Sequence, residues 1–115
     1  MDRVFENPKR PTREGRLVSI CAIEAVPDGR GAAVTLKEGG EIAVFNVGGQ
    51  FFATENFCPH RGFPLADARL YGLEVECDLH GWRFDLRTGD CLVEGGCPVE
   101  IYQVVVEEGT VKAII

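Results

Sequence analysis

Motifs of enzyme active sites are missing from this sequence, and histidine is scarce. Two histidines, one methionine and one tryptophan occur in 115 residues. We find no Ser-His-Asp set, no nucleophile elbow and no phosphate-binding glycine loop, because the paired glycines fall where hairpin turns are predicted. We therefore expect no catalytic residues, no enzymatic activity of the chain alone and no small-molecule substrate of its own.

Long apolar segments are also missing. No run approaches the length of a membrane-spanning helix, and the amino terminus lacks the apolar stretch of a signal peptide. These features predict a cytoplasmic protein without a membrane partner. In a reducing cytosol, cysteines that bind no metal are expected to be thiols.

Basic residues are outnumbered 12 to 18 by acidic ones, which gives a formal net charge of -6. Residues 1–16 carry five basic and three acidic side chains, so the acidic excess lies in residues 17–115. Such a surface would repel nucleic-acid phosphates, and we expect no nucleic-acid partner. It suits docking on a basic protein, although acidic charge serves solubility at least as often.

Both histidines lie close to a cysteine, in Cys58-Pro59-His60 and in Cys77-Asp78-Leu79-His80. Thiolate and imidazole bind zinc or iron–sulfur clusters. Each half pairs one Cys with one His, whereas zinc fingers usually place two Cys in one half and two His in the other. This alternation favours two similar loops around a two-iron cluster. The alternatives are a closed zinc site, or buried cysteines with incidental histidines; visible absorption separates a cluster from zinc.

Three cysteines lie outside this pattern. Cys21 belongs to an apolar run over residues 17–23, and it is predicted to be a small core residue of a buried strand. Cys91 and Cys97 are six residues apart. We expect both to be thiols, and a disulfide between them is the alternative, because compartment and spacing alone do not set disulfide geometry.

Apolar and alternating stretches separated by turn residues predict an all-β, antiparallel fold. A short turn is expected at residues 65–68, and residues 1–16, which have two prolines and no apolar periodicity, are expected to be an arm. Strands are expected at residues 17–23, 32–36, 41–47, 50–54, 73–76, 82–85, 102–106 and 110–115.

The pattern C-x-H, a spacer, then C-x-x-H resembles that of the Rieske 2Fe-2S family over about residues 17–115. Glycines also match the family at Gly62 and Gly81. The resemblance implies a Rieske-type sandwich or barrel in one domain, 17–115, with a small cluster-binding subdomain formed by two loops at about 56–98. It implies one 2Fe-2S cluster per chain, with both Cys on one iron and both His on the other. The cofactor-binding and metal-ligating residues would be Cys58, His60, Cys77 and His80.

The sequence around the expected ligands favours a low reduction potential. High-potential members of the family resemble C-x-H-x-x-C with C-x-C-H-x-S-x-Y, in which two further cysteines bridge the loops and two hydroxyls donate to the cluster. This chain has Phe63 and Leu79 at the bridging positions, and Trp82 and Phe84 at the hydroxyl positions. We therefore expect a potential toward the low end of the Rieske range.

The resemblance implies a soluble ferredoxin, a one-electron carrier between a flavoprotein ferredoxin reductase and the terminal oxygenase of a ring-hydroxylating system. An oxygenase would itself need a mononuclear iron with two further histidines, which the chain lacks. The alternatives are a non-catalytic small subunit of a nitrite-reductase-like complex and an iron–sulfur redox sensor. Docking is expected at the tips of the two loops, flanked by Arg61, Phe63, Pro64, Leu79 and Trp82.

Overall fold

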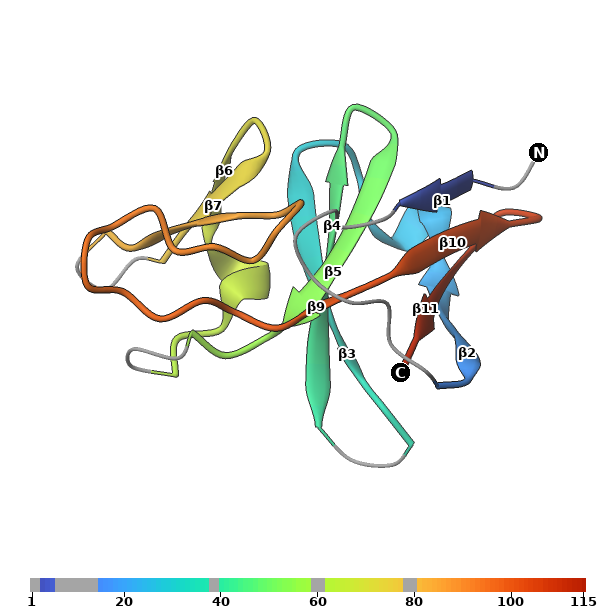
Figure 1. Cartoon of the computed structure of the whole chain (residues 1–115). Coiled ribbons are helices and arrows are strands. Elements are labelled where there is room, and N and C mark those ends of the chain that lie inside the picture. Colours follow the sequence, from blue (N-terminus) through green and yellow to red (C-terminus); the bar gives the residue numbers. More distant parts are fainter. Residues whose placement is uncertain (1–2, 6–14, 38–39, 59–61, 78–80) are drawn as a thin grey trace.

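The computed structural model describes residues 3–5, 15–37, 40–58, 62–77 and 81–115 of the chain, and nearly all of its regular structure is β (Figure 1). The strands are β1 Arg3–Phe5, β2 Leu17–Ala22, β3 Arg30–Thr35, β4 Glu41–Val47, β5 Gln50–Glu55, β6 Arg69–Tyr71, β7 Glu74–Glu76, β8 Arg83–Asp85, β9 Ile101–Tyr102, β10 Val104–Glu107 and β11 Thr110–Ile114. Two single-turn 3-10 helices are η1 Ile23–Ala25 and η2 Leu65–Asp67. The expectation of an all-β fold is confirmed.

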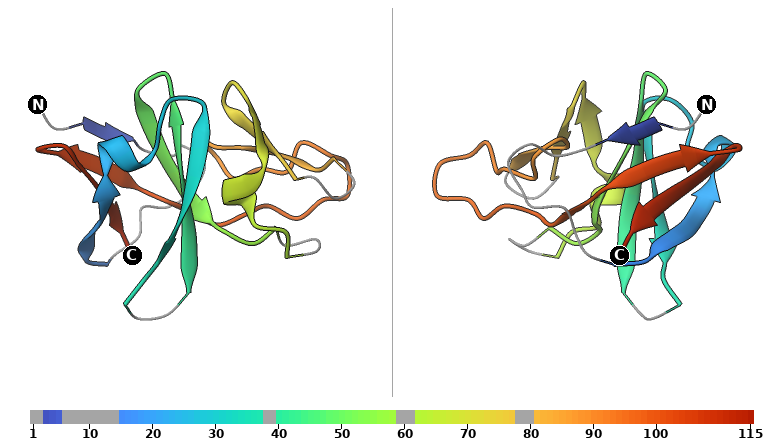
Figure 2. Two further views of the ribbon diagram at one scale, coloured as in Figure 1. Left: turned by 180° about the vertical axis from the view of Figure 1, so that it is seen from behind. Right: turned by 45° about the vertical axis from the view of Figure 1, so that its right-hand side comes forward.

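The described strands form three antiparallel sheets. Their orders are β1-β10-β11-β2, β3-β4-β5-β9 and β6-β7-β8. The first two sheets face each other as a sandwich, and the small third sheet lies beside the second one (Figures 1 and 2). The chain passes from the second sheet to the first between β9 and β10. Because these described strands form open sheets, the sandwich is the correct one of the two expected architectures.

Strand β4 is buried on both faces, because the second sheet is the middle layer. Successive side chains of a strand point to opposite faces, and β4 accordingly contributes alternate residues to two separate cores. The sandwich core lies toward the first sheet and contains Val26, Ile42, Val44, Phe51, Ala53, Val104 and Val111. The subdomain core lies toward the third sheet and contains Ala43, Phe45, Phe52, Cys58, Leu65, Ala66, Val75, Cys77, Phe84, Leu86 and Val99.

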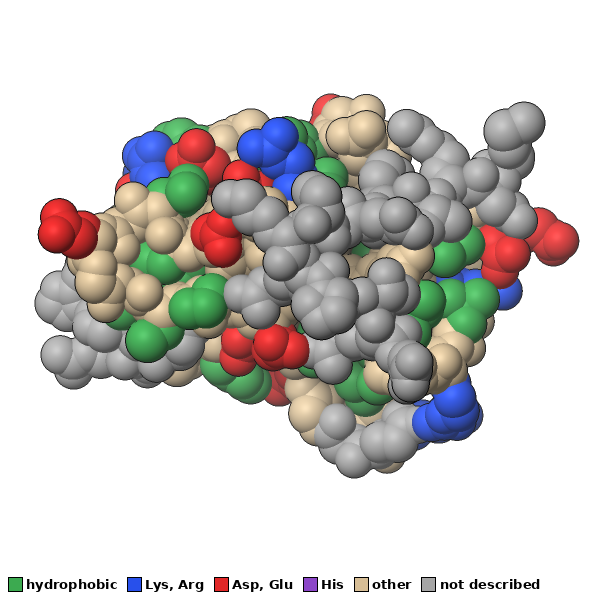
Figure 3. Space-filling model, viewed as in Figure 1, with side chains coloured by type: hydrophobic (Ala, Val, Ile, Leu, Met, Phe, Trp, Pro, Cys, Tyr) green, Lys and Arg blue, Asp and Glu red, His purple; other side chains and the backbone are tan. Residues whose placement is uncertain are grey.

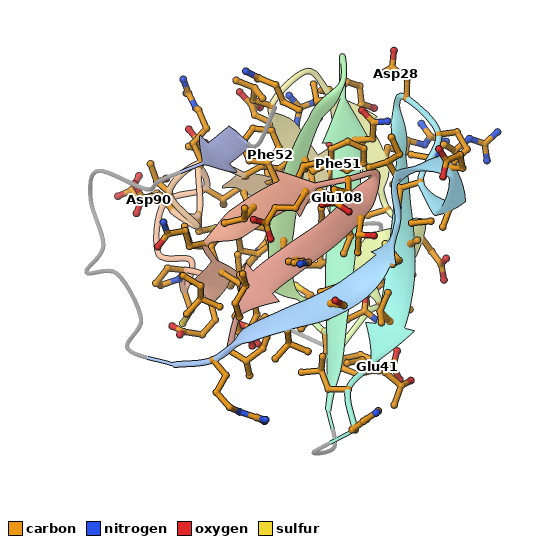
Figure 4. All side chains as sticks on the ribbon, turned by 90° about the vertical axis from the view of Figure 1, so that its right-hand side faces the viewer. Asp28, Glu41, Phe51, Phe52, Asp90 and Glu108 are labelled. Atoms are coloured by element: carbon orange, nitrogen blue, oxygen red, sulfur yellow. The ribbon has the colours of Figure 1, made fainter. Side chains whose placement is uncertain are left out.

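Strand β5 repeats this division. Phe51 belongs to the sandwich core and its neighbour Phe52 to the subdomain core; both are labelled in Figure 4, which looks onto the sheet formed by β10, β11 and β2. The middle sheet therefore offers the third sheet an apolar floor. The first residue expected to bind the cluster, Cys58, lies shortly after the end of β5 at Glu55, so the first loop starts from this floor.

The structure departs from the sequence expectations in four places. The single strand expected at residues 102–106 is divided between β9 in the second sheet and β10 in the first. Residues 3–5, inside the expected arm, form β1 and pair with β10, and β6 was not predicted. The strand at residues 17–23 was expected to be buried, but β2 is an edge strand with one face in solvent: Leu17 is 47% exposed and Cys21 is only half-buried against the sandwich core. The cause is the position of β2 at the end of the sheet.

No described helix is long and apolar enough to cross a membrane.

Candidate metal centre

The cysteines of the two predicted ligand pairs are buried in the same core. Cys58 is 2% exposed and Cys77 is 0% exposed, and both belong to the subdomain core. Their partners in the motif, His60 and His80, lie outside the described residues. Within the residues that are described, no group of three or more His, Cys, Asp or Glu side chains gathers that could hold a metal.

Each cysteine begins a loop that closes in the same way. The amide of Cys58 donates to the carbonyl oxygen of Phe63 at 2.8 Å, and the amide of Cys77 donates to that of Trp82 at 2.7 Å. In both cases the acceptor lies five residues after the cysteine. The residue before each acceptor is glycine with positive φ, 74° at Gly62 and 67° at Gly81, a conformation that other residues adopt at a cost.

Asn56 anchors the first loop and was not singled out by the sequence. Its side-chain amide donates to Glu41 at 3.1 Å, and its side-chain oxygen accepts from the amide of Ala66 at 3.0 Å. Its backbone carbonyl accepts from the amide of Leu65, so Asn56 joins β4 to η2, the helix that follows the loop. Asn56 is 2% exposed. In the sequence, the only indication of this role was a polar amide side chain between a predicted strand and a candidate ligand.

The second loop joins β7 to β8, which pair through Glu76 and Arg83. The Arg83 guanidinium bonds the Glu76 carboxylate at 3.1 Å and lies 3.5 Å from that of Glu74. It also stacks over the ring of Tyr71 in β6, 4.4 Å from the centroid. The hydrogen bond to Glu76 is the main reason why the pKa of Arg83 is raised. One cation therefore links all three strands of the subdomain sheet.

A second charged pair fixes the turn that follows β8. Arg87 donates to the Asp85 carboxylate from Nε at 3.2 Å, from Nη2 at 3.0 Å and from its backbone amide at 2.8 Å. Burial alone would raise the pKa of Asp85, but these bonds and the Arg87 charge outweigh it, so the pKa is lowered. The carboxylate is therefore held ionised where the chain leaves β8.

The aromatic residues of the second loop are apolar and packed. Phe84 is fully buried and Trp82 is half-buried against the subdomain core, with their ring centroids 6.3 Å apart. Trp82, which was expected beside the docking tip, therefore lies partly in the core and partly at the surface. Of the expected docking residues, Phe63 and Pro64 are half-buried, whereas Arg61 and Leu79 lie outside the described residues. Phe57, which was not among the expected docking residues, is 45% exposed directly before Cys58.

The donor chemistry of the two loops fits an iron–sulfur cluster. A buried thiolate is costly without a positive partner, and two such thiolates at the bases of matching loops would be stabilised by soft or borderline metal ions. The structure contains no disulfide among its described cysteines, so the sulfurs of Cys58 and Cys77 are not tied up in a disulfide bond. Imidazole ligands two and three residues further along the loops would complete the set.

Comparison with known proteins decides the family. Residues 16–112 match the Rieske [2Fe-2S] domain. The chain belongs to this family. It is 40% identical over 97 residues to the ferredoxin component of the p-cumate 2,3-dioxygenase system of Pseudomonas putida, covering 83% of this chain and 82% of that protein. An iron–sulfur cofactor follows from the family.

Two solved structures show where the fold recurs. One is the complex of reduced oxygenase and oxidized ferredoxin in carbazole 1,9a-dioxygenase, with a TM-score of 0.79 and 30% identity over 88% of this chain and 94% of the matched chain. The other is from Mycobacterium tuberculosis and is described as an NADH-dependent nitrite reductase small subunit, with a TM-score of 0.80, 24% identity and coverage of 90% and 97%. The similarity to the Mycobacterium tuberculosis structure shows a shared fold and nothing about function.

Proposed function

We propose that the chain is a one-electron carrier that accepts electrons from a flavoprotein ferredoxin reductase and passes them to the terminal oxygenase of a ring-hydroxylating dioxygenase system. The observation that carries this proposal is the 40% identity to a dioxygenase ferredoxin component, which extends over more than four-fifths of both chains. An oxygenase would need two further histidines for a mononuclear iron, and the sequence has only the two that are proposed as cluster ligands.

The proposed ligands are Cys58, His60, Cys77 and His80, holding one 2Fe-2S cluster per chain. The burial and matching hydrogen bonds of the two cysteines support this set. The cluster supplies a single electron-accepting centre. The protein supplies two buried cysteines on an apolar floor, and the buried Phe84 ring where high-potential relatives carry a hydroxyl donor. A low potential is therefore proposed.

We further propose that residues 17–115 are the functional domain and that about 56–98 is its cluster-binding part. Residues 1–16 would be an arm that is attached to the first sheet where residues 3–5 pair with β10. Absence of a long apolar segment from the sequence supports a cytoplasmic location. Partners would dock at the end of the molecule that carries the two loops, where Phe57, Leu92 and Val93 are exposed. Hydrophobic and acidic side chains share that end, at the left of Figure 3.

The test is reconstitution of electron flow. The purified holoprotein should contain iron and sulfide in equal amounts, and a dioxygenase reductase with NADH should bleach its visible absorption. Adding oxygenase, its aromatic substrate and oxygen should restore the colour and yield product. Cys77→Ser should lack both colour and activity. Cys21→Ser, at a half-buried thiol of the sandwich, is the matched control and should retain both.

The outcomes separate the candidates. Zinc without iron would overturn the cluster and its ligands. A cluster that cycles with the reductase but never supports product formation with any oxygenase would favour the redox sensor. A stable complex with a nitrite reductase catalytic subunit, and no electron transfer to oxygenases, would favour the small-subunit alternative.

A further inference from the structure

Cys91 and Cys97 are the first and last residues of a turn beside the candidate metal centre. Cys91 is half-buried against the subdomain core, and Cys97 is exposed. The start of this turn is fixed on β8: Cys91 forms an isolated β-bridge with Phe84, and the amide of Leu92 donates to the carbonyl oxygen of Arg83 at 2.7 Å. Figures 1 and 2 place residues 91–98 at the same end as the described bases of the two candidate ligand loops.

The turn brings the chain back onto the sulfur of Cys91. The amide of Gly96 donates to the carbonyl oxygen of Val93 at 3.0 Å, and Gly95 takes a φ of 81°. A Cβ built on Gly96 would lie only 2.1 Å from the Cys91 Sγ. The sulfur therefore occupies the space that any side chain at position 96 would need. Cys97 is the next residue after Gly96, and neighbouring Cα atoms are about 3.8 Å apart. The backbone of Cys97 is therefore only one residue away from the position that contacts the Cys91 sulfur.

We propose that Cys91 and Cys97 form a reversible intramolecular disulfide, a thiol-oxidation site separate from the cluster ligands. Cys97 reacts first with the oxidant because it is exposed. Cys91 then acts as the resolving thiol, the one that attacks oxidised Cys97, because its sulfur is held beside the returning backbone. This inference does not depend on the identity of the electron-transfer partners.

The oxidant is a low-molecular-weight disulfide such as oxidised glutathione. The Cys97 thiolate attacks one glutathione sulfur, the S–S bond breaks, and one reduced glutathione leaves with the proton given up by Cys97. Cys91 then attacks the Cys97 sulfur of the mixed disulfide and releases a second glutathione with its own proton. Two protein thiols and one glutathione disulfide thus give one protein disulfide and two glutathione thiols, and excess reduced glutathione reverses the reaction.

Closing the bridge would constrain the segment that carries the exposed Leu92 and Val93. That segment is hydrogen-bonded to β8, the strand that follows the second candidate ligand loop. Oxidation would therefore alter the surface beside the metal centre without removing any proposed ligand.

The test equilibrates the holoprotein in glutathione buffers of graded composition and blocks free thiols before peptide mass spectrometry. In the wild type, Cys91 and Cys97 should lose their free thiols together and recover them together in reducing buffer, while Cys21 stays reactive and the visible absorption is unchanged. Cys91→Ala removes the resolving thiol, so Cys97 should accumulate as the glutathione mixed disulfide. Cys97→Ser should leave Cys91 as a thiol throughout.

Two results would overturn the site. In the first, wild-type Cys97 accumulates glutathione, or joins two chains, while Cys91 remains free. In the second, neither thiol changes in the most oxidising buffer although glutathione still modifies Cys97 in Cys91→Ala. Cys21→Ser is the matched control and should form the bridge as the wild type does. Unchanged visible absorption in every variant shows that the fold and the metal centre are intact.

Discussion

The backbone amide of Cys77 donates a hydrogen bond of 2.7 Å to the carbonyl oxygen of Trp82, five residues further on. Cys58 makes the equivalent bond to Phe63. The two loops therefore have equal length and the same closure, although the histidine is the second residue after the cysteine in one loop and the third in the other. The spacing of the motif alone conceals this equivalence.

We expect His60→Cys to retain a cluster whose reduction potential is lower than that of the wild type. Replacing a neutral imidazole by a thiolate adds negative charge, which disfavours uptake of an electron. The fall should be roughly 100 mV or more, on the scale that separates Rieske centres from all-cysteine clusters. Spectroelectrochemical titration measures it, with Cys21→Ser as the control. An unchanged potential would remove His60 from the ligand set.

Reversing the charge at Arg61 should change the rate of electron transfer to the oxygenase several-fold while leaving the visible spectrum intact. A charge near a docking surface acts mainly on the association rate, so the effect should shrink as salt is added. Lys37→Glu, at an exposed residue between β3 and β4, is the matched charge reversal. Stopped-flow mixing of reduced protein with oxygenase provides the rates. Equal rates for wild type and Arg61→Glu would place docking on another face.

Most strands could be predicted from the sequence because their apolar patterns are local. Runs such as residues 41–47 carry apolar side chains at consecutive positions, and β4 is indeed buried on both faces. The strands that were missed are short and depend on partners distant in the chain. Arg3–Phe5 becomes a strand only through pairing with β10, and Arg69–Tyr71 through pairing with β7. Burial of β2 was misjudged for the same reason, because its edge position is a property of the whole sheet.

The residues of the candidate site also differ in how far the sequence alone identifies them. Ligand chemistry is local, so the two Cys-His pairs were visible in the sequence. The residues that support the loops are not local in their contacts: Asn56 reaches Glu41 across the sheet, and Arg83 reaches the ring of Tyr71. Exposure of Phe57 likewise depends on how the loop leaves the sheet. No spacing rule identifies such residues.

Asn56 should be essential for the stability of the first loop. Asn56→Ala removes the acceptor of the Ala66 amide and leaves buried polar groups unpaired, which should lower the free energy of unfolding by about 2 kcal/mol. Asn56→Asp keeps that acceptor but places a second carboxylate beside Glu41, and it should be destabilising as well. Urea unfolding gives both values. Asn56→Asp combined with Glu41→Gln should recover part of the loss; a fully additive result would show that the two side chains do not interact.

The pair Asp85 and Arg87 should make part of the stability dependent on pH. Arg87 lowers the pKa of Asp85 in the folded protein, so the stabilisation is fully present above the unfolded value of about 3.9 and is lost as the pH falls through the lower folded value. Asp85→Asn keeps an acceptor for the Arg87 amide but removes the charge. It should lower the free energy of unfolding by about 1 kcal/mol at neutral pH, since the Arg87 side chain is 58% exposed and its charge is screened.

That difference between wild type and Asp85→Asn should shrink as the pH falls below about 4, because protonated aspartic acid and asparagine are both neutral. Urea unfolding of the two proteins at a series of pH values measures it. Arg87→Gln serves as the matched variant: it should also be destabilising, and the double variant should lose less than the sum of the two single losses. A difference that stays constant down to pH values well below 3 would mean that the Asp85 charge contributes nothing, and that its turn is held by backbone hydrogen bonds alone.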